Sequence, residues 1–183
     1  MHLYADDHRF WFNTQPTVQR LARDRAVDMK TELIETELNI RLREEERVKG
    51  MFTRIHASPG SSADIPDDPE MRLVILDPQH AHRRSQDDSP ALEISKVYLE
   101  TRGNQTRHLR NTLVFLAPDT GLMQSLSEAV ALYLAWKSIN AEKGESGLAL
   151  DPHQASQVEK QVQESSRTVS SRILETYCWL LVP

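Results

Sequence analysis

The stretch that decides the fold is Arg107-His108-Leu109-Arg110-Asn111-Thr112-Leu113-Val114-Phe115-Leu116-Ala117-Pro118-Asp119. Its first residues are polar and basic, its middle is a short apolar run rich in strand formers, and Pro118-Asp119 ends the run. A continuous apolar run between turn signals is typical of a strand buried on both faces, as in parallel sheets. Asp119 can cap a helix that follows. We therefore expect a central strand near residues 112–117, around which the rest of the chain packs.

Two further apolar runs predict the neighbours of this strand. Residues 51–57 form the first, and residues 71–76, which read Met-Arg-Leu-Val-Ile-Leu, form the second and end at Asp77-Pro78. Residues 58–70 between them are rich in turn formers and acidic at their end, which indicates an exposed loop. Together the runs predict a small, mostly parallel sheet of about three core strands.

Helical periodicity accounts for most of the remaining chain, because apolar residues recur there at steps of three and four. Helices are expected at about 16–47, 89–101, 119–143 and 151–181. The helix between the second and third strands predicts a parallel pair with a right-handed crossover. The last two helices predict an antiparallel helical hairpin. The tail from Tyr177 to Pro183 is apolar enough to form a buried strand instead, but we favour the helix.

The first residues predict a β-hairpin, since Leu3–Ala5 and Arg9–Phe12 flank Asp6-Asp7-His8. Its aromatic residues Phe10, Trp11 and Phe12 would be costly to leave in water, so they pack either on the domain or on an upstream region. Both ends of the chain are apolar, which is typical of a cut from a longer polypeptide. A homodimer through these apolar termini is the other expectation.

The fold class expected is therefore α/β, with a small, mostly parallel sheet flanked by long helices, a C-terminal antiparallel helical hairpin and an N-terminal β-hairpin. The expected organisation is a hairpin and linker at 1–14, an α/β domain at 15–143 and a long helix at 144–183 that packs on it. A length of 183 residues is enough to bury a real core.

Composition narrows the class of protein. Hydrophobic residues make up 39% and charged residues 27% of the chain, and no apolar stretch has transmembrane length. The net charge of -5 argues against a generic nucleic-acid binder, although a local basic patch can still act. The single cysteine, Cys178, excludes an internal disulfide and fits a reducing cytoplasm. The N-terminus does not have the pattern of a signal peptide.

Common catalytic motifs are missing from the sequence. It contains no phosphate-binding P-loop, no His-Glu-x-x-His, no Cys-x-x-Cys and no Gly-x-Ser-x-Gly. His80 and His82 invite a metal site, but no third ligand lies at a helical spacing beside them, so we favour a solvated loop. The pairs Asp67-Asp68 and Asp87-Asp88 lie in loops without the apolar shelter that would raise a carboxyl pKa. We therefore expect no self-sufficient active site, no catalytic residue and no metal ligand.

Clustered arginines are the best candidates for a contact site. Three of them bracket the turn at Gly103 and lead into the central strand, and two more lie on the first helix. Guanidinium groups bind phosphates and carboxylates well. The candidates for contact with a phosphate, a nucleic acid or a protein partner are Arg102, Arg107, Arg110, Asn111, Arg20 and Arg23. The alternative, which we favour, is that these arginines are paired locally or lie on solvated faces.

Arg110 has two alternative roles. It lies at the amino end of the central strand, whereas open parallel sheets bind ligands at the carboxyl edge. It could therefore reach outward to a neighbouring subunit, as an arginine finger does, or it could be a structural residue that pairs locally. We favour the structural role.

Several segments of the chain carry a resemblance to a known family. They are Arg9-Phe10-Trp11-Phe12-Asn13-Thr14-Gln15-Pro16, Arg23-Asp24-Arg25, Ser61-Ser62-Ala63-Asp64-Ile65-Pro66-Asp67, Glu100-Thr101-Arg102-Gly103-Asn104, Arg110-Asn111-Thr112-Leu113-Val114-Phe115-Leu116-Ala117 and Leu134-Ala135-Trp136-Lys137-Ser138-Ile139. They resemble stretches of large bacterial and archaeal P-loop ATPases, an AAA+-like family of unknown function in anti-phage (phage-exclusion) gene islands. The resemblance spans nearly the whole chain.

The resemblance implies a downstream region of such an ATPase, which lies outside its P-loop. It implies a non-catalytic accessory domain that couples the ATPase to a partner, with the upstream ATPase region or a neighbouring subunit as that partner. ATP and magnesium would then belong to the upstream region, and this chain would carry no cofactor of its own. The alternative function is a nucleic-acid- or phosphate-binding module that uses the arginines.

Overall fold

The computed structural model describes residues 2–6, 9–13, 17–45, 50–85, 87–142, 148 and 150–183, and for residues 2–6, 9–13 and 45 it describes the backbone alone. The chain forms two compact units. The helical unit comprises Met1–Ile34 and Glu128–Val169, and the sheet unit comprises Glu35–Ser127 and Ser170–Pro183. Each unit is assembled from segments that are distant in the sequence, so a division into consecutive segments cannot express this organisation.

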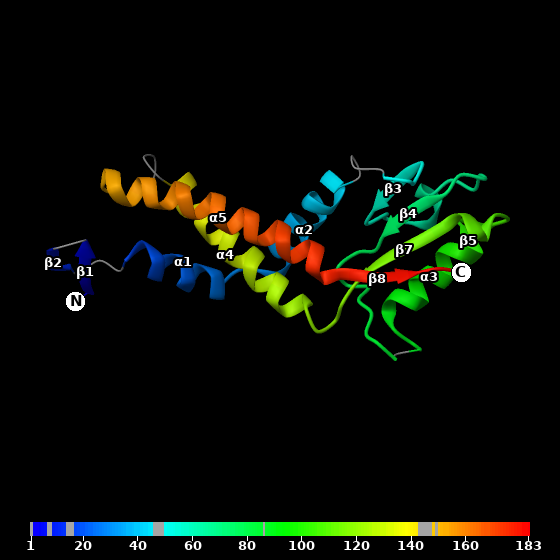
Figure 1. Ribbon diagram of the computed structural model, residues 1–183, viewed down its shortest axis with the longest axis horizontal. Helices are drawn as coiled ribbons and strands as arrows, with labels where there is room; N and C mark the ends of the chain where they lie inside the picture. The colour runs from blue at the N-terminus through cyan, green and yellow to red at the C-terminus, as the bar shows by residue number, and fades with distance from the viewer. Residues whose placement is uncertain are drawn as a thin grey trace. The chain divides into compact units, whose positions relative to one another are not determined.

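A four-stranded sheet forms the centre of the sheet unit (Figure 1). Its strands are β3 (Arg54–Ala57), β4 (Arg72–Ile75), β7 (Leu113–Pro118) and β8 (Tyr177–Leu181), in the order β3-β4-β7-β8. The first three are parallel, and β8 is antiparallel to β7. The prediction of a mostly parallel sheet is therefore confirmed, and β7, the expected central strand, has a neighbour on both sides.

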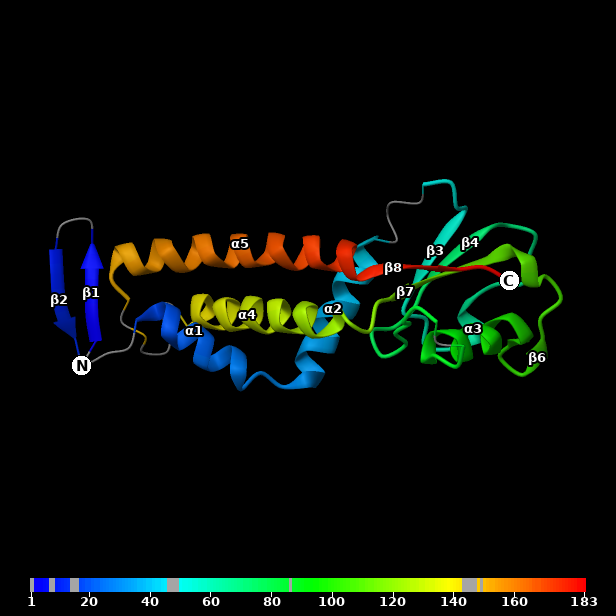
Figure 2. The same cartoon turned by 60° about the horizontal axis from the view of Figure 1, so that its bottom comes forward.

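One face of this sheet packs against α3 (Pro90–Glu100), which connects β4 to β7 (Figure 2). Ser89 caps the helix and Pro90 occupies its first turn, as the sequence predicts. The strand register places Val74 beside Phe115 and Phe115 beside Leu181 on this face. The buried core here comprises Ile65, Val74, Leu76, Ala91, Tyr98, Leu113, Phe115 and Ala117, with Ile94, Leu99, Trp179 and Leu181 packed against it.

The expected helix over residues 151–181 is wrong at its end, because α5 (Pro152–Thr176) gives way to β8. The Tyr177 hydroxyl donates to the Leu76 carbonyl at 3.2 Å, and the Trp179 indole N–H donates to the Asp119 carboxylate at 2.8 Å. A register shift, a β-bulge, lies where β8 begins to pair with Pro118. Pairing with β7 satisfies a row of backbone groups, and this outweighs the helical rhythm of the segment.

Short elements close the amino end of the sheet. They are the 3-10 turns η1 (Ser62–Asp64) and η2 (Arg110–Thr112) and the paired strands β5 (Thr101–Arg102) and β6 (Gln105–Thr106). Gly103 connects β5 to β6 with φ of 58°, and a Cβ atom there would lie 3.3 Å from the Cβ of Ala63. Glycine is therefore required at this turn both for its conformation and for the close approach of η1.

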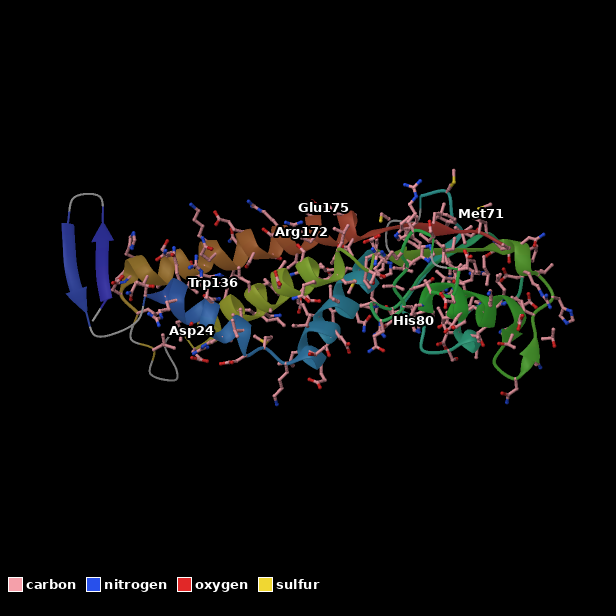
Figure 3. All side chains as sticks on the ribbon, turned by 90° about the horizontal axis from the view of Figure 1, so that it is seen from below. Asp24, Met71, His80, Trp136, Arg172 and Glu175 are labelled. Atoms are coloured by element: carbon pink, nitrogen blue, oxygen red, sulfur yellow. The ribbon has the colours of Figure 1, made fainter. Side chains whose placement is uncertain are left out.

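Three helices build the core of the helical unit. They are α1 (Val18–Val27), α4 (Met123–Ala141) from Glu128 onward, and α5 up to Val169. Val18 and Ala22 pack against Trp136 and Ile139 of α4 and Val158 of α5. Trp136 is labelled among these helices in Figure 3. The N-terminal hairpin is confirmed, since β1 (His2–Asp6) pairs antiparallel with β2 (Arg9–Asn13), but the packing of its aromatic side chains lies outside the described part of the chain.

The expected single helix over residues 16–47 is two helices. Helix α1 ends at Val27 with Asp28 as its C-cap, and α2 (Thr31–Glu45) begins three residues later. No glycine or proline marks this break, so periodicity alone could not place it. At the start of α1, the Thr17 side chain accepts a hydrogen bond from the Arg20 backbone at 3.3 Å.

Truncating a buried side chain in the α3-facing core of the sheet unit should lower the free energy of unfolding much more than truncating an exposed side chain. Phe115→Ala removes a ring that is 1% exposed, so we expect it to lower the free energy of unfolding by about 3–5 kcal/mol. Leu174→Ala truncates a side chain that is 72% exposed, and we expect a change within about 0.5 kcal/mol. Denaturant unfolding of both variants measures the difference. Equal losses in the two variants would contradict the packing described here.

Candidate functional site

Arg107 is buried, with an exposed fraction of 1%. Its Nε donates to the Tyr98 carbonyl at 2.8 Å, and its terminal nitrogens donate to the carbonyls of Pro66 at 2.8 Å, Ile65 at 3.0 Å and Ser62 at 3.5 Å. Burial lowers the pKa of the Arg107 guanidinium, and the nearby Asp67 carboxylate opposes that shift. The prediction that Arg107 contacts a partner is therefore corrected, because its donors are directed at the protein's own backbone.

Asp67 ties the same loop to the segment that leads into β7. Its carboxylate accepts hydrogen bonds from the backbone N–H groups of His108 at 2.8 Å and Leu109 at 2.9 Å, and it lies 3.9 Å from Arg107. The His108 and Leu109 hydrogen bonds, helped by the charge of Arg107, hold the pKa of Asp67 below its usual value of 3.8. Partial burial acts in the opposite direction, but the two hydrogen bonds outweigh it, so the pKa of Asp67 is lowered overall. Asp67 acts as a fixed anion that orders two loops.

Ser62 completes this network around η1. Its hydroxyl accepts a hydrogen bond from the Gly103 N–H at 2.9 Å and lies 3.3 Å from the Thr101 hydroxyl. Before it, the Ser61 hydroxyl and the Asp64 carboxylate form a capping box around η1. Two segments that carry the family resemblance, residues 61–67 and residues 100–104, are thus locked together by hydrogen bonds.

A hollow of about 650 Å³ lies over this network. Five residues line it, namely Asp67, Arg102, Gln105, Thr106 and His108. Arg102 and His108 are exposed, as are Arg110 and Asn111 at the start of η2. In the part of the chain that the structure describes, neither Arg102 nor Arg110 makes an ion pair with a carboxylate. The local pairing that we favoured for Arg110 is not what the structure places there.

Arg20 and Arg23 lie in the other unit. Both are exposed on α1, and Arg20 forms a loose ion pair with Asp24 at 3.8 Å. A solvated pair of this kind contributes little to stability. Arg102, Arg107 and Arg110 all belong to the sheet unit, so the candidate residues fall into two sets, one on each unit.

At the carboxyl edge of the sheet, the protein's own side chains form hydrogen bonds and packing contacts with one another. The ring of His82 lies within 2.6 Å of the Ser89 hydroxyl through Nδ1 and packs edge-on to Trp179 at 5.0 Å. The His82 N–H donates to the Pro118 carbonyl at 2.8 Å, and the Asp119 carboxylate accepts from Trp179 and from the Gly121 N–H. His82 is 9% exposed, so the expected solvated loop is wrong at this residue.

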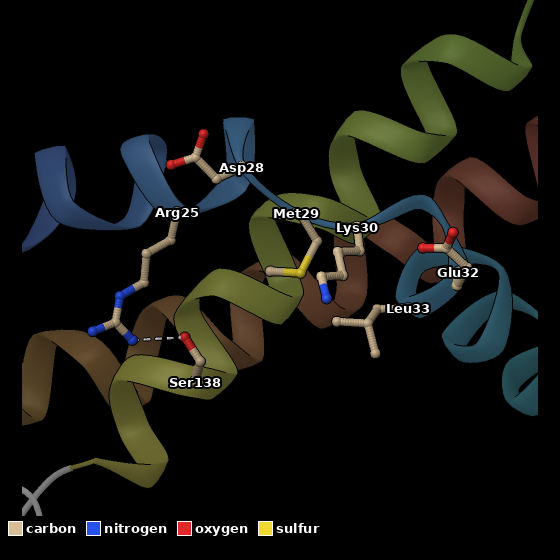
Figure 4. Close-up of a pocket in the computed structure, with 7 residues that line it drawn as sticks. All are labelled: Arg25, Asp28, Met29, Lys30, Glu32, Leu33 and Ser138. Atoms are coloured by element: carbon tan, nitrogen blue, oxygen red, sulfur yellow. Dashed lines mark hydrogen bonds between the residues drawn. The ribbon is translucent and has the colours of Figure 1, made fainter.

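A second hollow, of about 950 Å³, lies where α1 meets α2 in the helical unit (Figure 4). Met29 and Leu33 contribute apolar surface to it. Arg25 lies at its side and donates to both oxygens of Glu142 at 2.7 Å and to the Ser138 hydroxyl at 2.9 Å. The hydrogen bond from Arg25 lowers the pKa of Glu142. Arg25 is therefore engaged in joining α1 to α4, whereas Lys30, which also lines the hollow, is exposed.

Metal binding and membrane insertion can be judged from the residues that the structure describes. Within those residues, no group of three or more histidine, cysteine, aspartate or glutamate side chains is arranged to hold a metal ion. None of the helices in the same part of the chain combines the length and hydropathy that crossing a membrane requires.

Sequence reasoning found the exposed cations Arg102 and Arg110 but missed the residues that fix them. Asp67 lies 41 residues from His108, and Arg107 lies at similar distances from its carbonyl partners Ser62, Ile65 and Pro66. No local spacing signals such contacts. Gln105 and Thr106 were missed because only the fold places them around the same hollow.

Arg107 and Arg110 should differ in how much they contribute to stability. Arg107→Ala leaves several buried carbonyls without donors, so we expect a loss of about 3–5 kcal/mol in the free energy of unfolding. Arg110→Ala removes an exposed side chain, and we expect a change within about 0.5 kcal/mol. Thermal and denaturant melts of both variants test this. A comparable loss from Arg110→Ala would assign that residue a structural role.

The pH dependence of stability should depend on Asp67. Because folding depresses the pKa of Asp67 below 3.8, its stabilising effect is present above pH 3.8 and is lost as the pH falls through the folded-state pKa. We expect Asp67→Asn to lower the melting temperature at neutral pH, and the difference from the wild type to narrow in acid. Asp87→Asn, in an exposed loop, is the control. A difference independent of pH would contradict this role.

Comparisons with protein-family models, with curated proteins and with solved structures find no match to this chain.

Proposed function

We propose that this chain is a non-catalytic interaction domain of a large anti-phage P-loop ATPase and couples that ATPase to a partner or a neighbouring subunit. The resemblance of segments spread over nearly the whole chain supports this assignment. ATP and magnesium belong to the upstream P-loop region in this proposal. The single cysteine, which is free, fits a reducing cytoplasm as the site of action.

One observation carries the proposal. Arg102, His108 and Arg110 are exposed on a segment whose backbone is fixed from below by Arg107 and Asp67. Cations on a fixed backbone lose little conformational freedom when they bind an acidic or phosphorylated group. Such an arrangement is typical of a contact surface, because the groups that meet the partner are free while their support is rigid.

The polar residues that could suggest catalysis are engaged in the fold. His82 is bonded to Ser89, which is completely buried and caps α3. Asp119 is bonded to Trp179 and to the turn that follows it. A nucleophile or a general base must reach the reacting atoms, and these groups are directed at protein atoms instead. This supports an interaction role over a catalytic one.

The acceptor for the exposed arginines can be the nucleotide bound by a neighbouring subunit. Arg110 precedes β7 at the amino end of the parallel strands, which is opposite to the end where such sheets bind ligands. An arginine supplied from outside a nucleotide site stabilises the charge that develops on the phosphate during hydrolysis. In this proposal Arg110 is the arginine that acts on the neighbour.

Nucleic acid is the second candidate partner. The hollow that Arg102 and His108 line also presents Gln105 and Thr106, whose side chains can donate hydrogen bonds to a phosphate. Asp67 lies in the same hollow, but its oxygens face the backbone N–H groups of the neighbouring loop. The net charge of -5 opposes general binding, so any affinity would be local and would fall steeply with salt.

Two measurements on the same variants test the proposal. The isolated chain is expected neither to hydrolyse ATP nor to bind it, and robust turnover would overturn the assignment. In the full-length ATPase, the double variant Arg102→Ala/Arg110→Ala is expected to lower ATP turnover by about tenfold or more, because a trans-acting arginine contributes strongly to phosphoryl transfer. The melting temperature of the isolated chain should stay unchanged.

Arg83→Ala/Arg84→Ala is the matched control, since it removes the same charge from an exposed loop of the same unit. Fluorescence anisotropy with single-stranded and duplex DNA at low salt tests the second candidate. Salt-dependent binding that only Arg102→Ala/Arg110→Ala abolishes, together with unchanged ATP turnover, would favour nucleic acid. Turnover lost equally in both double variants would remove the specific role of Arg102 and Arg110.

A further inference from the structure

Strand β8 lies at an edge of the sheet without the usual protection. Within the described residues it pairs with β7 alone, so one row of its backbone N–H and C=O groups has no strand beside it. Its sequence, Tyr177-Cys178-Trp179-Leu180-Leu181, contains no charged residue and no proline. Proteins normally blunt an exposed edge with lysine, proline, a bulge or a covering element. The bulge here is confined to the first residues of β8 and leaves Trp179–Leu181 regular.

The opposite edge of the same sheet shows the contrast. Strand β3 is four residues long, carries the exposed Arg54 and half-buried His56, and is followed directly by Ser58, whose φ is 44°. A short strand with a charge and an abrupt end is a poor template for pairing. The sheet therefore has one protected edge and one that is open to another strand.

Exposed apolar side chains gather at the open edge. The register places Ala57, Ile75, Leu116 and Leu180 in one row across the face that lies opposite α3. Exposure rises along this row, from 5% at Ala57 and 4% at Ile75 to 60% at Leu180. Val182, directly after the strand, is 68% exposed. Within this row, the exposed apolar side chain is therefore the one on β8.

We infer that β8 is a homodimerisation strand, which pairs antiparallel with β8 of a second copy of this chain and joins the two sheets into one. A two-fold axis brings each residue near the middle of β8 close to its counterpart. Because β8 carries no charge, two copies of this strand can pair without electrostatic repulsion between them, although the chain as a whole has a net charge of -5. The exposed Leu180 side chains then bury each other on one face of the joined sheet. This surface is separate from the arginines of the proposed function.

The first test is the mass of the intact chain in solution. Analytical ultracentrifugation from the low to the high micromolar range should show a monomer–dimer equilibrium for the wild type. Leu180→Lys should be monomeric throughout, because the two-fold axis would bring two lysine ammonium groups together on one face. A wild type that stays monomeric over the whole range overturns the inference.

Control variants distinguish disruption of the interface from disruption of folding. Leu174→Lys adds the same charge at a position on α5 that is 72% exposed, and it should dimerise like the wild type. Leu180→Glu alone should be monomeric, but mixing it with Leu180→Lys should restore a heterodimer, which only folded chains with adjacent residue-180 side chains can form. Val182→Lys is the substitute if either variant has a lowered melting temperature. Dimers that survive every charge at 180 and 182, or that Leu174→Lys also disrupts, contradict a β8 interface.

Discussion

The sheet unit depends on the buried cation of Arg107. The Arg107 guanidinium is surrounded by backbone carbonyls from the end of α3 and from the loop that contains η1. A buried charge is tolerated only when its donors are satisfied, so burying Arg107 fixes the positions of those carbonyls. The loop from Ser58 to Met71 contains little regular structure of its own, and Arg107 together with Asp67 gives it a defined path. The same bonds hold the segment that enters β7.

The sequence predicts those elements whose burial is encoded by neighbouring residues. The apolar runs of β4 and β7 and the Ser89-Pro90 start of α3 are local signals, and the structure confirms them. Residues 177–181 are different, because their apolar positions fit both a helical rhythm and a strand with alternating faces. Only the free edge of β7 decides between the two structures, and that edge becomes available when the rest of the sheet has formed.

The difference between local signals and tertiary contacts also limits what the sequence predicts about the site. Arg102, Arg107 and Arg110 lie within nine residues and look equivalent in the sequence, yet Arg107 is buried while the other two are exposed. What separates them is the position of carbonyls about forty residues away in the chain, with Ser62, Ile65 and Pro66 as the acceptors. A cluster of arginines thus predicts a region rather than the role of each member.

The two ends of the parallel strands differ in whether their polar side chains are engaged within the protein or exposed to solvent. At the carboxyl ends, where open sheets usually hold ligands, His82 and Trp179 pack together and Asp119 accepts the Trp179 N–H, so β8 is fastened across that edge. At the amino ends, Arg107 satisfies the interior and leaves Arg102 and Arg110 to the solvent. The usual binding edge therefore contributes stability in this protein, because its polar side chains are engaged with one another.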